Sequence, residues 1–300
     1  MSLTSFIEIP EIKTGLHQNF LMPKLTEKRD IIAPLISSNP SHTGIAFDYL
    51  LRFYIQKINP SSLSQEWIAE NLLAIIRNSR IKNNWEKSKT EEGAEKAIKN
   101  ARGLHSKYIE SKKDRAGIGL IKASIQLAYL DEMYRGGVWY GDGPPNTFDK
   151  KEIIDLINLL KIVNPVTFKT TNICLLNPRF GKTAEIIRGA DADLVIDDTL
   201  IDIKTTKNFS LHRREFNQLL GYYLLHRIDG AGQIKPKIKI KKLGIYYSRF
   251  GYLYTVNLED IGSEKTFTNF AKFFKNKAVE IDQISKEMKE RREKDGTTVK

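Results

Sequence analysis

Apolar residues recur at helical spacing through residues 43–160 of the chain. Positions three and four residues apart are apolar within 46–53 and again within 67–76, which predicts amphipathic helices. Residues 86–113 are highly charged and contain few large apolar side chains, so we expect a largely solvated helix or pair of helices there. Residues 118–133 are more apolar, and we expect them to pack into the core.

The pattern changes after a loop rich in glycine and proline at residues 136–145. Beyond residue 170, short runs of β-branched and aromatic residues predict strands. Helical patterns around these runs predict helices at 151–160, 211–228 and 266–294. The expected fold class is therefore α/β (α+β), with a central mixed sheet flanked by helices and a large N-terminal helical region. The predicted strands are 173–176, 190–196, 200–205, 243–247 and 252–256.

Two of these strands carry acidic and basic residues. Strand alternation places Asp191 and Asp193 on one face of the first strand, and Asp202 and Lys204 on one face of the second. If residues 197–198 form a two-residue turn, Asp193 lies opposite Asp202 and Asp191 lies opposite Lys204. Facing carboxylates about 5 Å apart repel each other unless a cation lies between them. The pattern favours a site for Mg²⁺ or Mn²⁺, although an exposed hairpin whose acids face water would have the same spacing.

The predicted helix 211–228 carries a polar stripe. Its members recur every four residues and therefore share one face of the helix. Planar and hydroxyl-bearing side chains suit contacts with phosphate and water beside a metal ion, and a helix face exposed to solvent is the alternative. The stripe consists of Arg214, Gln218, Tyr222 and His226.

In chain order, these residues resemble the PD-(D/E)XK nuclease superfamily, and specifically its RecB-type branch. That branch combines an aspartate strand, a D-x-K strand and a Q-x-x-x-Y helix. The corresponding residues here are Asp193, the run 202–204 (Asp-Ile-Lys) and the run 218–222 (Gln-Leu-Leu-Gly-Tyr). The resemblance covers roughly residues 170–257, and the ordered set is more specific than D-x-K alone. It implies a restriction-endonuclease-like core and Mg²⁺- or Mn²⁺-dependent hydrolysis of phosphodiester bonds.

The resemblance also implies a metal-binding set. Asp193, Asp202 and the backbone carbonyl of Ile203 would hold one or two ions. This branch takes a further ligand from a more N-terminal helix, where a histidine or an acid follows a glycine by four residues. Asp48 matches that spacing with an oxygen ligand, which hard cations prefer. A capping or solvent-facing role for Asp48 is equally open, and Glu185 is then the alternative third acid.

The implied catalytic residues would act on the attacking water and the phosphate. The resemblance assigns Lys204 to positioning and activating the water. A lysine ammonium beside carboxylates stays protonated at neutral pH, so we favour an orienting and electrostatic role over that of a free base. Gln218 and Tyr222 would hold water or the phosphate, and Arg214 could bind a further phosphate.

If Asp48 reaches the metal site, its helix must fold back onto the hairpin across about 145 intervening residues. The helical residues between them would then form an insertion in one nuclease domain rather than a separate domain. The expected organisation is 1–60 as a segment contributing a helix to the core, 61–148 as a helical insertion, 149–262 as the PD-(D/E)XK core, and 263–300 as an amphipathic helix with a basic tail.

The net charge of the chain is +12, from 48 basic and 36 acidic residues. Residues 231–300 contribute much of the excess, with 16 Lys/Arg against 9 Asp/Glu. Within them, Lys237, Lys239 and Lys241 alternate with isoleucines, which predicts a strand with one basic face that could follow a nucleic-acid backbone. The expected partner is DNA, with RNA not excluded, and a solubilising surface is the alternative explanation of the charge.

Composition and missing motifs exclude several further classes of protein and of site. The single cysteine, Cys174, excludes an intrachain disulfide framework, a four-cysteine zinc site and a four-cysteine iron–sulfur cluster. No apolar run approaches the ~18 residues of a membrane span, and the first residues lack a signal peptide's apolar centre. We therefore expect a cytoplasmic protein without a membrane partner. A G-x-x-x-x-G-K-[ST] loop is missing, so the chain carries no helicase motor.

Two functional hypotheses remain. The first is a catalytic nuclease acting on DNA in repair, restriction or defence. The second is a nucleic-acid-binding protein on the same fold that does not catalyse. Retention of both acids and the lysine favours the first, and a homo-oligomer is left open.

Overall fold

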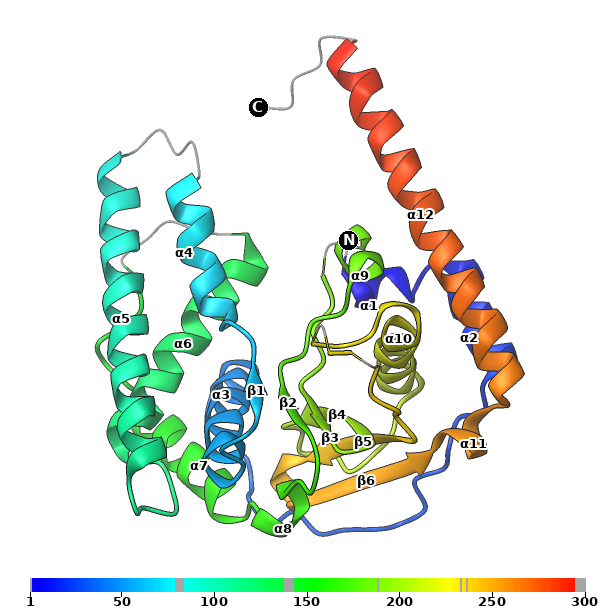
Figure 1. The fold of residues 1–300 in the computed structure, drawn as a ribbon. Helices are drawn as coiled ribbons and strands as arrows, with labels where there is room; N and C mark the ends of the chain where they lie inside the picture. Colours follow the sequence, from blue (N-terminus) through cyan, green and yellow to red (C-terminus); the bar gives the residue numbers. More distant parts are fainter. Residues whose placement is uncertain are drawn as a thin grey trace.

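The structure, a computed structural model, contains one mixed sheet with helices on both faces (Figure 1). Part of the predicted glycine-rich loop, residues 138–142, and the last six residues of the predicted C-terminal segment 263–300 lie outside the described residues. The described residues are 2–78, 84–137, 143–187, 189–232, 234–235 and 237–294.

Helices account for most of the described chain. The predicted helices 118–133, 151–160 and 211–228 are confirmed with ends shifted by at most three residues. The helices are α1 (Leu3–Phe6), α2 (Pro10–Asn19), α3 (Pro40–Ile58), α4 (Ile68–Asn78), α5 (Asn84–Glu110), α6 (Ile118–Gly136), α7 (Lys150–Lys161), α8 (Pro165–Phe168), α9 (Lys182–Ile186), α10 (Arg213–Asp229), the 3-10 helix η1 (Ser248–Phe250), α11 (Leu258–Ile261) and α12 (Glu264–Lys294).

Six strands of the described chain form the sheet in the order β1-β2-β3-β4-β5-β6. Two neighbouring pairs, β1–β2 and β4–β5, are parallel, and the other three are antiparallel. The parallel pair β4–β5 needs a crossover, which α10 provides. The prediction of a mixed sheet flanked by helices is confirmed. The strands are β1 (Leu63–Ser64), β2 (Cys174–Leu176), β3 (Leu194–Ile196), β4 (Thr199–Lys204), β5 (Lys242–Tyr247) and β6 (Tyr252–Asn257).

The first strand of the acidic hairpin is shorter than predicted, because β3 begins at Leu194 and not at residue 190. The residues before it still bond to the β2 side, where the Asn177 N–H donates to the Asp193 carbonyl at 2.8 Å. On the β4 side, the Asp193 side chain replaces the main chain and accepts the Ile203 N–H at 2.6 Å. An aspartate that uses its carboxylate in this way ends the ladder between the two strands.

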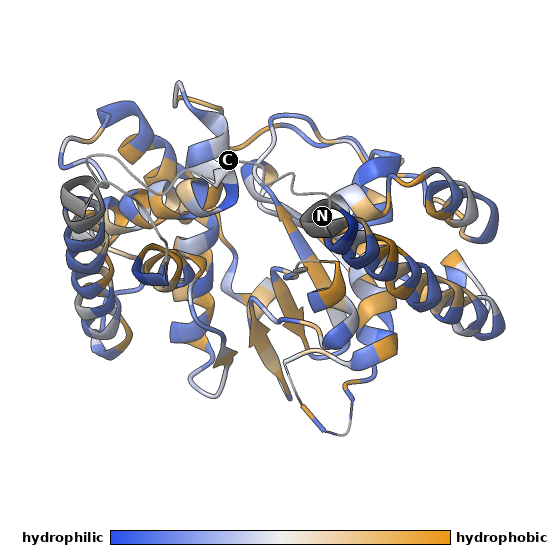
Figure 2. Cartoon of the chain, turned by 90° about the horizontal axis from the view of Figure 1, so that it is seen from above, coloured by the Kyte–Doolittle hydropathy of each residue, from blue (hydrophilic) through white to orange (hydrophobic). Residues whose placement is uncertain are grey.

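Side-chain alternation divides the sheet between two hydrophobic cores. Leu194 and its partner Ile201 face the core that contains α3 to α7. Val195 and its partner Leu200 face the core that contains α10 and α12. Viewed from above, the strands are apolar and the outer helices turn hydrophilic sides outward (Figure 2). The sheet is therefore the middle layer of three.

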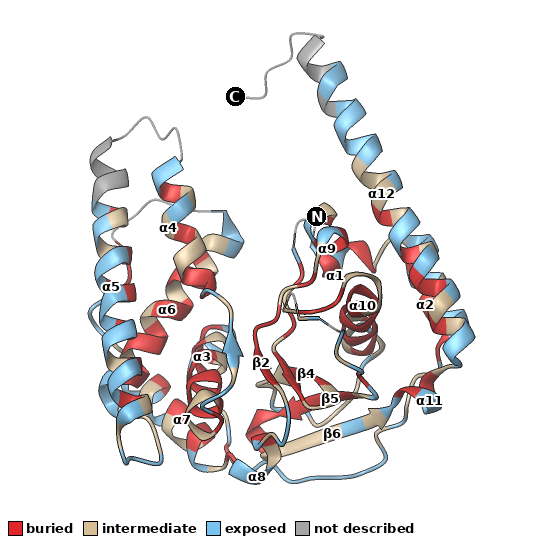
Figure 3. Cartoon of the chain, in the orientation of Figure 1, coloured by how far each residue is buried: buried red, intermediate tan, exposed pale blue. Residues whose placement is uncertain are grey.

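Helix α3 is buried far more completely than an amphipathic pattern suggests. Phe47, Leu50, Leu51 and Phe53 are all 2% exposed or less, because α6 and α7 pack on this helix while it lies against the sheet (Figure 3). Its first turn is fixed by Asn39, whose side chain accepts the His42 N–H at 3.3 Å. The helix thus joins the helical half of the molecule to the sheet.

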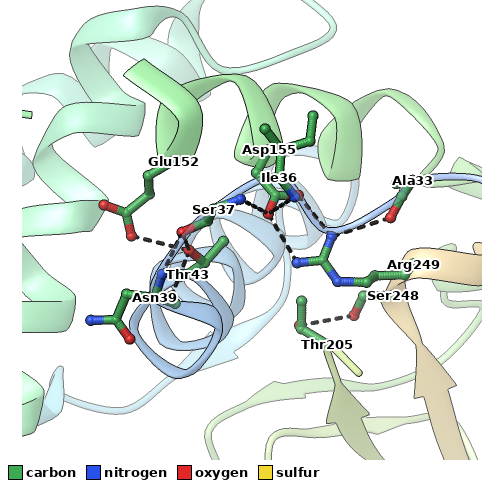
Figure 4. A network of polar contacts seen from close by, with 10 residues as sticks. All are labelled: Ala33, Ile36, Ser37, Asn39, Thr43, Glu152, Asp155, Thr205, Ser248 and Arg249. Carbon is green, nitrogen blue, oxygen red and sulfur yellow. Dashed lines mark hydrogen bonds and ion pairs between the residues drawn. The ribbon is translucent and has the colours of Figure 1, made fainter. Parts of the chain in front are cut away.

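A buried ion pair holds this junction together (Figure 4). Asp155 on α7 receives both terminal nitrogens of Arg249 on η1, at 2.7 and 3.0 Å. Asp155 Oδ2 also accepts the backbone N–H groups of Ile36 and Ser37, just before α3. Both charged side chains are about fully buried. The pair therefore ties α7, the segment before α3 and the end of the sheet into one unit.

Helix α12 packs on α10, which covers the other face of the sheet. Phe267, Phe270 and Phe274 are buried, as their spacing predicts, whereas Ile284 is 44% exposed. The C-terminal part of the helix extends beyond the body of the molecule (Figure 1). Among the described residues, none of the helices is both long enough and apolar enough to cross a membrane.

Candidate active site

The β3–β4 hairpin brings the first two predicted acids together. Ile196 pairs with Thr199 around a two-residue turn, as predicted. Asp193 and Asp202 then lie at the same level of the hairpin, although the ladder itself stops one residue short of them. Asp202 is only 4% exposed. Two carboxylates are therefore held side by side at the edge of the core.

Electrostatic crowding is strongest at Asp193. Burial raises the pKa of its carboxyl group well above the ordinary value, and the charges of Asp202 and Asp48 raise it further. The Ile203 N–H and the Lys204 ammonium act in the opposite direction. A carboxylate that costs this much to ionise favours a compensating cation.

Lys204 lies between the acids and the helix α10. Its Nζ is 2.8 Å from Asp202 Oδ2 and donates to Gln218 Oε1 at 3.3 Å. Burial alone would lower the pKa of this ammonium, but the carboxylates of Asp202 and Asp193 outweigh burial and raise it. The lysine is therefore a cation at neutral pH.

The polar stripe of α10 continues this chain of contacts. Gln218 Nε2 donates to the Tyr222 hydroxyl at 3.0 Å, one turn further along the helix. Burial raises the pKa of Tyr222 well above its ordinary value, as do the charges of Asp202 and Asp193. The Tyr222 ring stacks on Phe180 with centroids 5.9 Å apart. The hydroxyl is thus kept neutral and held in position.

Asp48 reaches the same site from α3. Its Oδ2 pairs with Arg52 Nη2 at 2.6 Å, whereas its Oδ1 is buried without a hydrogen-bond partner. Burial raises the pKa of this carboxyl group, with Arg52 opposing the shift and Asp131 adding to it. The preceding Gly44 lies against the chain just after β4, since a Cβ added there would be 3.7 Å from Thr205 Cβ.

One cavity of about 400 Å³ collects these residues. Its walls come from α3, α6, the β3–β4 hairpin and α10, which are far apart in the sequence, from Ser41 on α3 to Tyr222 on α10. The cavity thus brings together all the catalytic and metal-binding residues inferred from the sequence. They are Asp48, Asp193, Asp202, Ile203, Lys204, Gln218 and Tyr222.

The donor set suits a hard divalent cation, because carboxylate oxygens and a carbonyl line the cavity. Two buried oxygens, Asp48 Oδ1 and Asp202 Oδ2, lack a hydrogen bond, although the latter forms the ion pair with Lys204. As the side chains stand, however, no three acidic, histidine or cysteine groups of the described residues converge as tightly as a bound ion requires. Each acid instead has a protein partner, which an ion would have to displace.

Several predicted site residues lie elsewhere. Arg214 is exposed in the first turn of α10 and does not line the cavity. Glu185 on α9 lines a different cavity. Asp191 does line the cavity, but its predicted pairing with Lys204 does not form, because the β3–β4 ladder ends at Leu194 and the charge partner of Asp191 is Arg179 at 3.7 Å.

The predicted basic strand is also wrong. Lys237, Lys239 and Lys241 are exposed, and the isoleucines between them turn inward, but these residues join no strand and precede β5. Lys237 Nζ instead donates to the carbonyls of Arg227 and Ile228, so it caps the end of α10. Lys241 lies near the turn of the hairpin, 3.9 Å from Asp198. That is the end opposite Lys204.

Several residues that line the cavity were not predicted from the sequence, among them two charged residues and one buried amide. Asp131 and Arg135 come from α6, and the buried Asn177 follows β2. The spacing of Asp131 and Arg135, four residues apart at the end of an apolar helix, was a usable signal for an ion pair. Asn177 gave no such signal in the sequence.

No family model, no curated protein and no solved structure matches this chain. The roles of its residues are therefore inferred from their own contacts, burial and charge.

Proposed function

We propose that this chain is a Mg²⁺- or Mn²⁺-dependent nuclease that hydrolyses phosphodiester bonds in DNA on a PD-(D/E)XK core. The observation that carries the proposal is the convergence of acids, a lysine, an amide and a tyrosine from the β3–β4 hairpin, α3 and α10 on one cavity. Nothing in the packing of the core requires these polar groups to meet. Such a cluster of ionisable groups with shifted pKa values is typical of a catalytic site.

Asp193, Asp202 and Asp48 would hold the cation, with the Ile203 carbonyl as a further oxygen ligand. The chemistry that the ion supplies is a lowered pKa of a bound water and relief of charge at the phosphate oxygens. The metal-free site is prepared for it, since burial and mutual repulsion already raise the pKa of Asp193. A divalent ion would offset that repulsion.

Lys204 would act as a fixed positive charge beside the acids. Its raised pKa keeps the ammonium protonated at neutral pH, so it donates hydrogen bonds rather than accepting a proton. An ammonium at this place can orient the attacking water and stabilise the negative charge that develops on the phosphate. Asp202 and Gln218 hold the ammonium on two sides and keep it aimed into the cavity.

Tyr222 would be a neutral hydrogen-bond donor. Its raised pKa prevents ionisation over the physiological range, and Gln218 fixes its hydroxyl. In this arrangement Gln218 links Lys204 to Tyr222, so the polar face of α10 forms one wall against which water or phosphate binds.

The test is a digestion assay with purified protein and linear duplex, circular duplex and single-stranded DNA, and with RNA. Each substrate is incubated with Mg²⁺, with Mn²⁺ and with EDTA. We expect metal-dependent cleavage that Lys204→Ala abolishes. Lys241→Ala is the matched control, because Lys241 is an exposed lysine whose acidic neighbour, Asp198, lies at the turn of the same hairpin.

Binding without cleavage by the wild-type protein under every metal condition would favour the alternative, a non-catalytic nucleic-acid-binding protein. Equal loss of cleavage in Lys204→Ala and Lys241→Ala would refute the assignment of the site.

A further inference from the structure

The end of α6 adds two charged residues to the cavity, and neither belongs to the acidic hairpin or to the polar stripe. Asp131 and Arg135 line the cavity together with Asp193, Asp202 and Lys204. Arg135 also lines an adjoining cavity of about 740 Å³, which shares Gln218 and Tyr222 with the first. The arginine therefore stands where the two cavities meet.

Asp131 is an unusual residue for its position. It is 2% exposed on a helix whose neighbouring residues are packed in the core. Its carboxylate accepts a hydrogen bond from Arg135 Nε and one from the Tyr49 hydroxyl at 3.4 Å. A buried carboxylate with these two partners holds the arginine by one edge.

The rest of the Arg135 side chain is accessible, since 60% of its surface is exposed. Arg135 contacts Asp131 through Nε. Its two terminal nitrogens donate no hydrogen bond to any other described residue. These nitrogens form the part of the guanidinium that binds phosphate oxygens in pairs.

The residues that line the 400 Å³ cavity include more acids than cations, and Arg135 is one of the cations. Five aspartates line it, and the described cations that do so are Lys204 and Arg135. Lys204 is already engaged by Asp202 and Gln218. Arg135 is therefore the cation that remains accessible to an incoming anion.

We propose that Arg135 binds a phosphate of the substrate beside the metal-binding acids, with Asp131 as its positioning residue. This inference rests on the proposed nuclease function and extends it, because it adds α6 to the elements that contact the substrate. The hairpin and α10 would supply the reacting groups, and α6 would supply the charge that holds the neighbouring phosphate. The competing explanation is structural: Arg135 serves only to neutralise buried Asp131.

Steady-state kinetics on the preferred DNA substrate can separate the two explanations. We expect Arg135→Gln to lower kcat/KM on the order of tenfold to a hundredfold, mainly through KM, because a hydrogen-bonded charge contact is lost. Arg135→Lys should recover part of the loss, since it keeps the charge without the planar fork. Asp131→Asn should cause a smaller loss of the same kind. Arg102→Gln is the matched control, because Arg102 pairs with Glu70 at 2.5 Å in the same half of the molecule but lines neither cavity.

A binding measurement gives a readout that a structural role would not change. A fluorescein-labelled 20-nucleotide DNA is titrated at several salt concentrations with Lys204→Ala protein and with Lys204→Ala/Arg135→Gln protein. Loss of one phosphate contact should reduce the log–log slope by about 0.7 to 0.9. An unchanged slope together with unchanged kcat/KM would overturn the inference, even if the melting temperature falls.

Failure of this inference is distinguishable from failure of the proposed function. If the wild-type protein and the Arg135→Gln variant cut DNA equally well, the nuclease proposal stands and the role of Arg135 is refuted. A wild-type protein that cuts nothing would refute the nuclease proposal, and the salt slopes would still decide whether Arg135 contacts phosphate.

Discussion

The two ends of the β3–β4 hairpin place aspartates in opposite environments. At the turn, Asp197 accepts hydrogen bonds from the chain just before β2, including the Thr170 hydroxyl at 2.6 Å and the Asn172 N–H at 2.8 Å. Slight burial opposes the shift, but these bonds lower the pKa of Asp197 to about 2. At the open end, burial and the charges of Asp202 and Asp48 raise the pKa of Asp193.

This difference separates an acid with a structural role from the acid that we propose as a metal ligand. Asp197 gains stability from its charge, because the surrounding donors favour the ionised form. In the metal-free protein, ionisation of Asp193 destabilises the folded state. Residues that destabilise the fold in this way are concentrated at functional sites. Position in the same hairpin therefore says less about the role of an acid than its hydrogen-bond partners do.

The largest expected effect is on activity. Asp193→Asn should reduce cleavage by roughly 10³-fold or more, since catalytic groups that act together fail together. It should leave the free energy of unfolding unchanged or raise it by about 1 kcal/mol, because repulsion is relieved. Asp197→Asn should do the reverse, with near wild-type cleavage and a loss of about 1 kcal/mol. Digestion assays and urea unfolding of both variants provide the test. A change of the same sign in the free energy of unfolding of the two variants would contradict the comparison.

The second prediction extends the comparison to Asp155, an acid that is buried and fully partnered. Asp155→Ala should destabilise the protein by about 3–5 kcal/mol, because Arg249 would remain buried without its partner. The double variant Asp155→Leu/Arg249→Met should recover much of the loss, since both charges are removed. Urea unfolding measures both variants. Equal stability of the single variant and the wild type would show that partnered acids are not needed at this junction.

The third prediction concerns the metal. At a free Mg²⁺ concentration about 100 times its Kd, the free energy of unfolding should rise by about 2.7 kcal/mol, with a rise of a few degrees in Tm. Asp193→Asn should remove most of the rise, whereas Asp197→Asn should retain it. Thermal unfolding with EDTA as reference is the measurement. A rise of equal size in Asp193→Asn would place the ion elsewhere.

The smallest effect is the pH dependence of the metal-free protein. Asp197 has a lowered pKa, so its contribution to stability is present above about pH 4 and is lost as pH falls towards 2. Solvent screening keeps that contribution below about 1 kcal/mol. Asp193 has a raised pKa, so its penalty grows as pH rises above about 4. In EDTA, the stability differences of both variants from wild type should therefore shrink towards zero on acidification, and a difference that grows at low pH would contradict this.

Much of the fold could be predicted from sequence periodicity. The hairpin register followed from the two-residue turn, and the helix carrying Gln218 and Tyr222 followed from its apolar spacing. Local rules suffice there, because both features depend on residues close together in the chain.

The rest depends on long-range packing. No periodicity reveals that Arg135 and Lys204 line the same cavity, because that depends on the packing of α6 on α3 and of α3 against the sheet. The alternation at Lys237 to Lys241 correctly predicted which side chains are exposed, but alternation does not supply a neighbouring strand to bond with. Likewise, the ladder ends before Asp193 because a side chain takes a backbone bond, which a propensity cannot foresee.

The placement of Asp48 on α3 has a consequence during synthesis on the ribosome. Asp48 is made about 150 residues before Lys204, which at typical rates of roughly 5–20 residues per second is an interval of about 8–30 s. Throughout that interval the nascent chain holds one wall of the cavity without the other. The proposed nuclease site is therefore incomplete while most of the chain is being translated, and it forms only after the strands have been synthesised and pack against the earlier helices.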